Sequence, residues 1–162
     1  FYILDLQPDN SLVQHCLAEG VQVFMLSWRN VDASMGHLTW DDYLETGAIE
    51  AIRVVQEISA QDEINLLGFC VGGTIVGATL AALAARKIYP IASLTLLTTL
   101  LDFSHPGVLG VFIDEQQVRL REQSLGGERE AFHNLATLQG LVVPLSCDRK
   151  LSTVILLSGK VG

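Results

Sequence analysis

The sequence predicts an α/β protein in which helices cover both faces of a parallel sheet. Three short apolar runs have the length and composition of buried strands, and stretches with helical periodicity separate them. The connections between these stretches are short, as they are in a parallel sheet with crossover helices. Of the 162 residues 49% are hydrophobic and only 17% are charged, so the chain suits one domain with a buried core.

The expected elements alternate through the first hundred residues. Each strand run is rich in β-forming residues, and the strands are expected at Val21–Trp28, Glu63–Phe69 and Ile91–Leu97. Helices are expected between Ser11 and Gly20, over residues 40–59 and over residues 71–87. The second helix is the clearest, because its apolar residues recur with a period of 3.6 and Thr39 and Asp42 match a capping pair.

The join between the second strand and the third helix carries the sequence Gly68-Phe69-Cys70-Val71-Gly72-Gly73. In a nucleophile elbow, a sharp strand-to-helix turn holds the nucleophile in a strained conformation. The glycines at 68, 72 and 73 would keep Cβ atoms out of this crowded turn. We therefore predict that Cys70 is a nucleophile above a helix N-terminus that favours its thiolate, with the Val71 N–H as oxyanion donor. The alternative is a buried, inert cysteine.

A cysteine nucleophile also needs a general base and an acid that orients it. In the α/β-hydrolase fold, where such elbows occur, the chain order is nucleophile, acid, histidine. The acids to consider after Cys70 are Asp102 and Asp114, and Asp102 is the candidate because it follows the third strand. His105 is too close to Asp102 in the chain to be its triad partner, and His133 lies where no element is predicted, so both are interpreted as loop or surface residues. A complete triad is not visible.

Charge and cysteine content exclude several other classes of protein. The net charge is −8 and no Lys/Arg patch is present, which argues against nucleic acid binding. Cys16, Cys70 and Cys147 fit neither a disulfide framework nor a zinc site, and we expect no metal and no cofactor. Cys16 is expected in the core. No apolar run reaches the roughly 18 residues of a membrane span. Free thiols suggest a reducing, cytoplasmic compartment.

Several blocks, in the same order, resemble the class I poly(3-hydroxyalkanoate) synthases. The blocks are Tyr2-Ile3-Leu4-Asp5-Leu6, Ser27-Trp28-Arg29-Asn30, Asp32-Ala33-Ser34-Met35, Thr39-Trp40-Asp41-Asp42-Tyr43, Gly68-Phe69-Cys70-Val71-Gly72-Gly73-Thr74 and Leu94-Thr95-Leu96-Leu97-Thr98-Thr99-Leu100-Leu101-Asp102-Phe103. The resemblance implies a partial α/β-hydrolase core over residues 1–106 and the start of a cap over residues 107–127. Residues 128–162 depart from the family and form an unassigned tail. Because the first residue is Phe1, we expect that the natural start lies upstream.

The resemblance also implies an activity. The family polymerises (R)-3-hydroxyacyl-CoA into a polyester through a thioester on a lipase-box cysteine, which falls on Cys70. Its catalytic Asp and His would lie beyond the matched region, so the chain alone is expected to be inactive. The implied partners are the acyl-CoA, the growing polyester and a second subunit at the surface of a cytoplasmic polymer granule. The alternatives are a cysteine hydrolase, such as a thioesterase or a dienelactone-hydrolase-like enzyme, and a non-catalytic α/β module.

Overall fold

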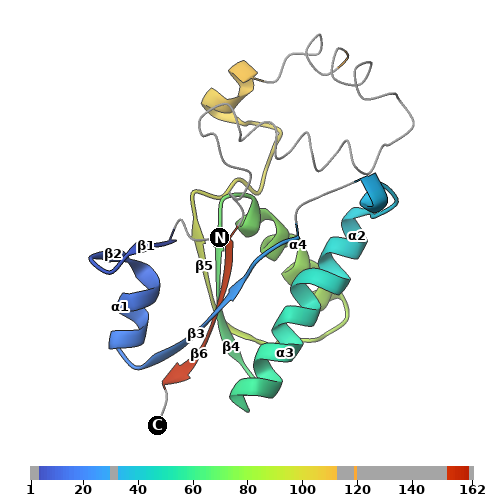
Figure 1. Cartoon of the computed structure of the whole chain (residues 1–162). Coiled ribbons are helices and arrows are strands. Elements are labelled where there is room, and N and C mark those ends of the chain that lie inside the picture. The colour runs from blue at the N-terminus through green and yellow to red at the C-terminus, as the bar shows by residue number, and fades with distance from the viewer. Residues whose placement is uncertain (1–3, 30–32, 113–118, 120–152, 161–162) are drawn as a thin grey trace.

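A four-stranded sheet between helical layers forms the centre of the computed structural model, which describes residues 4–29, 33–112, 119 and 153–160 (Figure 1). The strands of the sheet are β3 (Val21–Leu26), β4 (Ile64–Phe69), β5 (Ile91–Leu97) and β6 (Thr153–Lys160). The helices packed on it are α1 (Leu12–Ala18), α3 (Glu50–Ser59) and α4 (Val71–Ala85). The remaining short elements are β1 (Asp5–Gln7), β2 (Asn10–Ser11), η2 (Ala33–Met35), α2 (Trp40–Asp42), η3 (Tyr43–Ile49) and η4 (Gly107–Phe112).

The strands and helices predicted from the sequence are present, with small differences at their ends. The first predicted strand ends at Leu26, two residues early, and the third predicted helix ends at Ala85. Helix α1 begins at the predicted place because the Ser11 side chain accepts a hydrogen bond from the Gln14 N–H at 2.9 Å. It stops before Gly20, which has the positive φ of +76° that terminates many helices.

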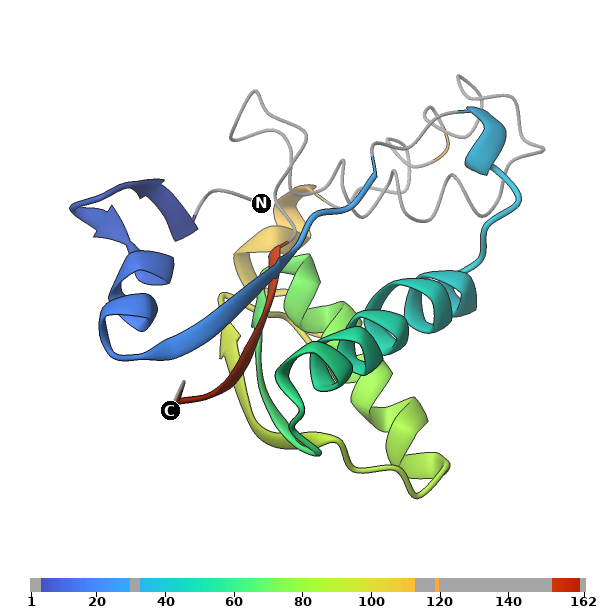
Figure 2. The ribbon, with the colours of Figure 1, turned by 60° about the horizontal axis from the view of Figure 1, so that its bottom comes forward.

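The two sheet faces are covered by different helices, as predicted. Successive strand residues point to opposite faces, and this divides β4 between two cores. Leu66 packs in one core with residues of α3 and α4. Leu67 packs in the other with Val13 of α1. Both views show α1 on one side of the strands and α3 and α4 on the other (Figures 1 and 2).

The strand order is β3-β6-β4-β5, and β6 is the part that the sequence did not predict. Strands β4 and β5 are parallel, whereas β6 is antiparallel to both of its neighbours. It follows that β3, β4 and β5 run in one direction, as predicted, and that β6 lies between them in the opposite direction. The segment 128–162, left unassigned above, therefore contributes residues 153–160 to the sheet. Of the cap region expected over residues 107–127, the structure describes η4 and residue 119, and the other residues lie outside the described part of the chain.

The predicted helix over residues 40–59 is continuous but not uniform. Thr39 and Asp42 form the expected capping box: the Thr39 N–H donates to the Asp42 carboxylate at 2.7 Å, and the Asp42 N–H to the Thr39 hydroxyl at 3.4 Å. Between α2 and α3 the chain forms seven residues of π-helix, η3. A carbon placed as Cβ on Gly47, within η3, would lie 2.5 Å from the Trp28 ring. The indole of Trp28 thus occupies the space beside Gly47.

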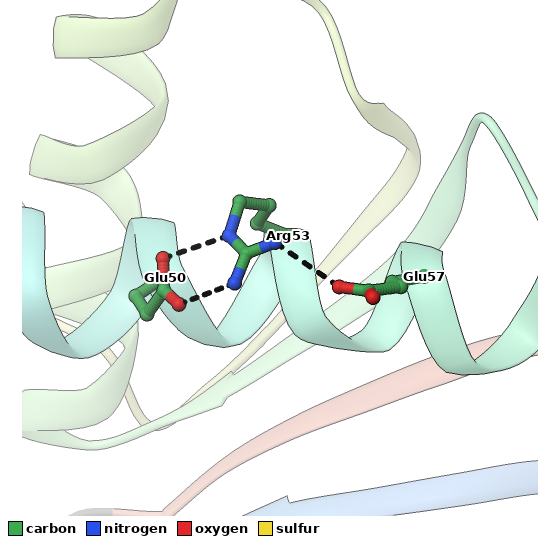
Figure 3. A network of polar contacts seen from close by, with 3 residues as sticks. All are labelled: Glu50, Arg53 and Glu57. Atoms are coloured by element: carbon green, nitrogen blue, oxygen red, sulfur yellow. Dashed lines mark hydrogen bonds and ion pairs between the residues drawn. The ribbon is translucent and has the colours of Figure 1, made fainter.

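The outer face of α3 carries an ion-pair network centred on Arg53 (Figure 3). The guanidinium donates to both oxygens of Glu50, at 2.6 and 2.9 Å, and to Glu57 at 3.1 Å. Hydrogen bonds from Arg53 lower the pKa of Glu50 below its ordinary value. All three side chains are well exposed, so the network orients the solvent face of the helix and contributes little to stability.

Candidate active site at the turn between β4 and α4

The turn predicted to hold the nucleophile lies between the end of β4 and the start of α4. Cys70 is the residue between them, with φ 55° and ψ −125°. This is a rare conformation for a residue with a side chain, and such strained residues cluster at functional sites. The Cys70 side chain is half-buried and does not cap the helix. The sulfur therefore lies at the turn without making a hydrogen bond that caps the helix.

The glycines around Cys70 are required by close packing of strand against helix. A Cβ atom on Gly68 would lie 2.5 Å from the Gly73 Cα. A Cβ atom on Gly73 would lie 2.6 Å from the Cγ2 of Thr99 and 2.8 Å from its Cβ. Real Cβ contacts are longer than this, so any larger residue at either position would push β4, α4 and the segment after β5 apart. Gly72 is buried beside them.

The backbone of the turn is fixed by hydrogen bonds on both sides of Cys70. Its N–H donates to the carbonyl of Leu97, at the end of β5, at 2.9 Å. Its carbonyl accepts from the N–H groups of Gly73 at 3.0 Å and Thr74 at 3.4 Å. The N–H groups of Val71 and Gly72 are the ones that a helix start leaves without an intrahelical acceptor. They are available in principle to an oxyanion next to Cys70.

The candidate acid, Asp102, lies in the exposed loop after β5. The Ser104 hydroxyl and N–H both donate to one of its oxygens, at 2.6 and 2.9 Å, and they lower the pKa of Asp102. The same Ser104 hydroxyl lies 3.0 Å from Nδ1 of His105. Asp102 and His105 are thus linked through Ser104 within one loop, and among the described residues Asp102 makes no hydrogen bond with Cys70. His133 and Cys147 lie outside the described residues.

Other predicted features of the site region can be compared directly with the structure. Cys16 is half-buried on α1, and so is less enclosed than expected for a core residue. Within the described part of the chain, no group of three or more His, Cys, Asp or Glu side chains could hold a metal ion. No helix among those residues is long and apolar enough to cross a membrane. Thr99 was part of a matched sequence block, but no role was predicted for it.

The chain that forms this fold and the strained turn at Cys70 is similar to known proteins. Residues 4–140 match the family model of the alpha/beta hydrolase fold, and the chain belongs to that family. Its sequence is 60% identical over 141 residues to the poly(3-hydroxyalkanoate) polymerase subunit PhaC of Cupriavidus necator, covering 87% of this chain and 24% of that protein. The predicted resemblance to these polymerases is confirmed.

Two more distant relatives carry the same name. The PhaC subunit of Rhizobium etli is 40% identical over 125 residues, which are 77% of this chain and 20% of that protein. The PhaC subunit of Haloferax mediterranei is 41% identical over 116 residues, or 71% of this chain and 23% of that protein. The chain spans about a quarter or less of the length of these curated relatives. Strand β6 lies beyond the residues that the family model matches.

Proposed function

We propose that this polypeptide is part of an acyltransferase that polymerises (R)-3-hydroxyacyl-CoA into polyhydroxyalkanoate. The observation that carries the proposal is the strained conformation of Cys70 at a strand–helix turn, in a chain whose relatives are named poly(3-hydroxyalkanoate) polymerases. Cys70 is the proposed nucleophile and the Val71 N–H the proposed oxyanion donor. Gly68 and Gly73 allow the close packing that the turn needs, and Gly72 is buried beside them.

The chemistry explains why a cysteine suits this reaction. The Cys70 sulfur attacks the carbonyl carbon of the acyl-CoA, a new thioester forms and the coenzyme A thiolate leaves. One thioester replaces another, so the acyl group stays activated for attack by the hydroxyl of the next unit. A general base must accept the proton of Cys70, return it to the departing coenzyme A thiolate, and then accept the proton of that hydroxyl. We expect the acid and histidine for this task beyond the part of the protein present here, with Asp102 as the alternative acid.

Polymer growth sets further conditions on the whole protein. Water must be excluded from the acylated site, because hydrolysis would end the chain. We propose that the cap beginning at residues 107–127 does this over a core formed by residues 1–106. The proposed partners are the acyl-CoA, the growing polyester and a second subunit, at the surface of a polymer granule in the cytoplasm. Nucleic acid is not among them, since the net charge is −8.

The test uses the protein with its flanking sequence restored. Cys70→Ala is expected to abolish both coenzyme A release and insoluble polymer, because no covalent intermediate can form. Cys70→Ser is expected to lose most polymerisation, since an alkoxide is harder to generate and its ester is less activated. Cys16→Ala is the matched control, because Cys16 lies on α1 away from the turn. Near-normal polymer formation by either Cys70 variant would contradict the proposal. Release of free hydroxy acid without polymer by the parent protein would indicate a hydrolase.

The 162-residue chain alone is expected not to turn over substrate. Large apolar side chains are exposed on β5, in the loop after it and on η4, namely Leu94, Leu101, Phe103 and Val108. An apolar surface of this kind favours aggregation or contact with further protein. The measurement is coenzyme A release from 3-hydroxybutyryl-CoA. A single slow acylation of Cys70 is compatible with the proposal, whereas sustained release would point to His105 or His133 as a working base.

A further inference from the structure

Thr99 lies in the segment that follows β5 and packs against the turn between β4 and α4. It comes after Thr98, whose φ of +47° turns the chain back toward α4. The Thr99 side chain is half-buried and fills the space in which a Cβ atom of Gly73 would lie. Gly73 belongs to the first turn of the helix that begins at Cys70. Thr99 therefore contacts the nucleophile's own helix at its first turn.

The hydroxyl of Thr99 shares an acceptor with the backbone of Cys70. It donates to the Leu97 carbonyl at 3.1 Å, and it lies 3.5 Å from the carbonyl of Gly68. The Leu97 carbonyl also accepts the Cys70 N–H at 2.9 Å. One carbonyl thus joins the Thr99 side chain to the strained residue, and the hydroxyl restricts where that carbonyl can point.

A second contact fixes the same segment one residue further along α4. The Thr74 hydroxyl donates to the Leu100 carbonyl at 2.8 Å. Through this bond and the Thr99 contact, the segment of residues 98–101 packs against the start of α4. A strained φ persists only where surrounding contacts over-determine it, and this segment supplies such contacts for Cys70.

We propose that Thr99 is a positioning residue for Cys70: its hydroxyl orients the Leu97 carbonyl, which in turn holds the Cys70 N–H and keeps the sulfur above the helix N-terminus. This inference rests on the proposed role of Cys70 as nucleophile. Without the hydroxyl, Cys70 relaxes toward an ordinary conformation and its sulfur leaves the first-turn N–H groups. Those N–H groups then no longer lie next to the reacting sulfur, and Cys70 reacts more slowly with an electrophile.

The test measures the thiol itself and needs no polymerisation. The 162-residue chain is treated with iodoacetamide at neutral pH, and alkylation of each cysteine is followed by peptide mass spectrometry. Thr99→Ala is expected to slow alkylation of Cys70 by about fivefold. Thr99→Ser, which keeps the hydroxyl, is expected to restore the rate to within about twofold. Thr95→Val, on the exposed part of β5, is the control for loss of a threonine hydroxyl.

The outcomes test the role of Thr99 separately from the proposed role of Cys70 as nucleophile. Equal rates in Thr99→Ala and the parent would overturn the role of Thr99, as would equal slowing by Ala and Ser. A variant that is only less stable in urea, with an unchanged alkylation rate, would assign Thr99 to packing alone and also overturn it. If Thr99→Ala loses cooperative unfolding, Thr99→Val gives the same comparison. Should Cys70 in the parent react no faster than Cys16, the elbow itself fails, which is a separate result.

Discussion

Two glycines in two helices each face a larger side chain, and their surroundings differ. Gly73 in α4 faces Thr99, and Gly47 in η3 faces Trp28. Around Gly73 the neighbouring hydroxyl and backbone groups are hydrogen-bonded. Around Gly47, the Trp28 indole N–H is buried without a hydrogen-bond partner among the described residues. The Trp28 ring lies 5.8 Å from that of Tyr43, whose pKa is raised by burial.

The contact between Trp28 and Gly47 also borders an open groove. A groove of about 490 Å³ runs between β3 and the helical segment from α2 to α3, with Phe24, Leu26 and Trp28 along one side and Tyr43, Gly47 and Ala51 along the other. A substitution at Gly47 can therefore be absorbed by movement of the indole into this groove. At Gly73 the neighbour is a short side chain tied to the backbone. Close contacts at a glycine therefore differ in how well they tolerate substitution, depending on whether the neighbouring side chain can move.

Gly73→Ala is expected to have the largest effect. The new methyl group would overlap Thr99, and the cost is expected to exceed about 3 kcal/mol of unfolding free energy, at the upper end for overpacking. The matched control is Gly77→Ala, one turn along α4, where the new atom would meet only the mobile end of Leu101 at 2.8 Å. Urea unfolding of both variants is the measurement. Similar stability of the two variants would contradict the close packing at the elbow.

Gly47→Ala is expected to cost less, about 1 to 2 kcal/mol, because displacement of the Trp28 ring is partly offset by the better helix propensity of alanine. The ring must move, so tryptophan fluorescence should shift together with the urea midpoint. An unchanged spectrum with a loss as large as that of Gly73→Ala would show that the groove gives the indole no freedom.

The capping box of Thr39 and Asp42, at the start of the helical segment that contains Gly47, gives a smaller effect that depends on pH. Thr39→Ala removes the capping hydroxyl and is expected to cost about 1 kcal/mol at neutral pH. Hydrogen bonds from the Thr39 N–H and then its hydroxyl lower the pKa of Asp42 in the folded protein. Asp42 therefore stabilises the fold above its unfolded pKa of about 3.9, and this contribution is lost as the pH falls through the lower folded value. Thermal midpoints of the parent and Asp42→Asn should differ at pH 7 and converge in acid; a constant difference would contradict the cap.

Trp28→Phe is expected to have the smallest effect. It removes the indole N–H that lacks a partner, which offsets the loss of apolar area, and the change should stay below about 1 kcal/mol. Trp40→Phe is the control, since Trp40 packs against the same buried cluster. A loss above about 2 kcal/mol at Trp28 alone would indicate that its N–H is hydrogen-bonded in solution.

The elements that local pattern defines were predictable, and those that distant contacts define were not. Strands β3, β4 and β5 have apolar runs of strand length, and the turn at Cys70 has glycines at the spacing an elbow requires. The role of Thr99 depends on a contact with Gly73, far away in the chain, for which no local signal exists. The π-helical form of η3 coincides with the indole of Trp28 beside Gly47. Strand β6 has a suitable apolar run, but its partners are set by tertiary packing.

The position of β6 has a consequence for the order in which the chain can fold. Val23 of β3 pairs with Leu157 of β6, near the opposite end of the printed sequence. During translation, β3, β4 and the helices over them emerge with a slot about two strand spacings, or roughly 9.5 Å, wide between their facing edges. At about 5 to 20 residues per second, several seconds pass before residues 153–160 leave the ribosome. During that interval two bare edges flank the slot, and any extended peptide nearby can compete for it.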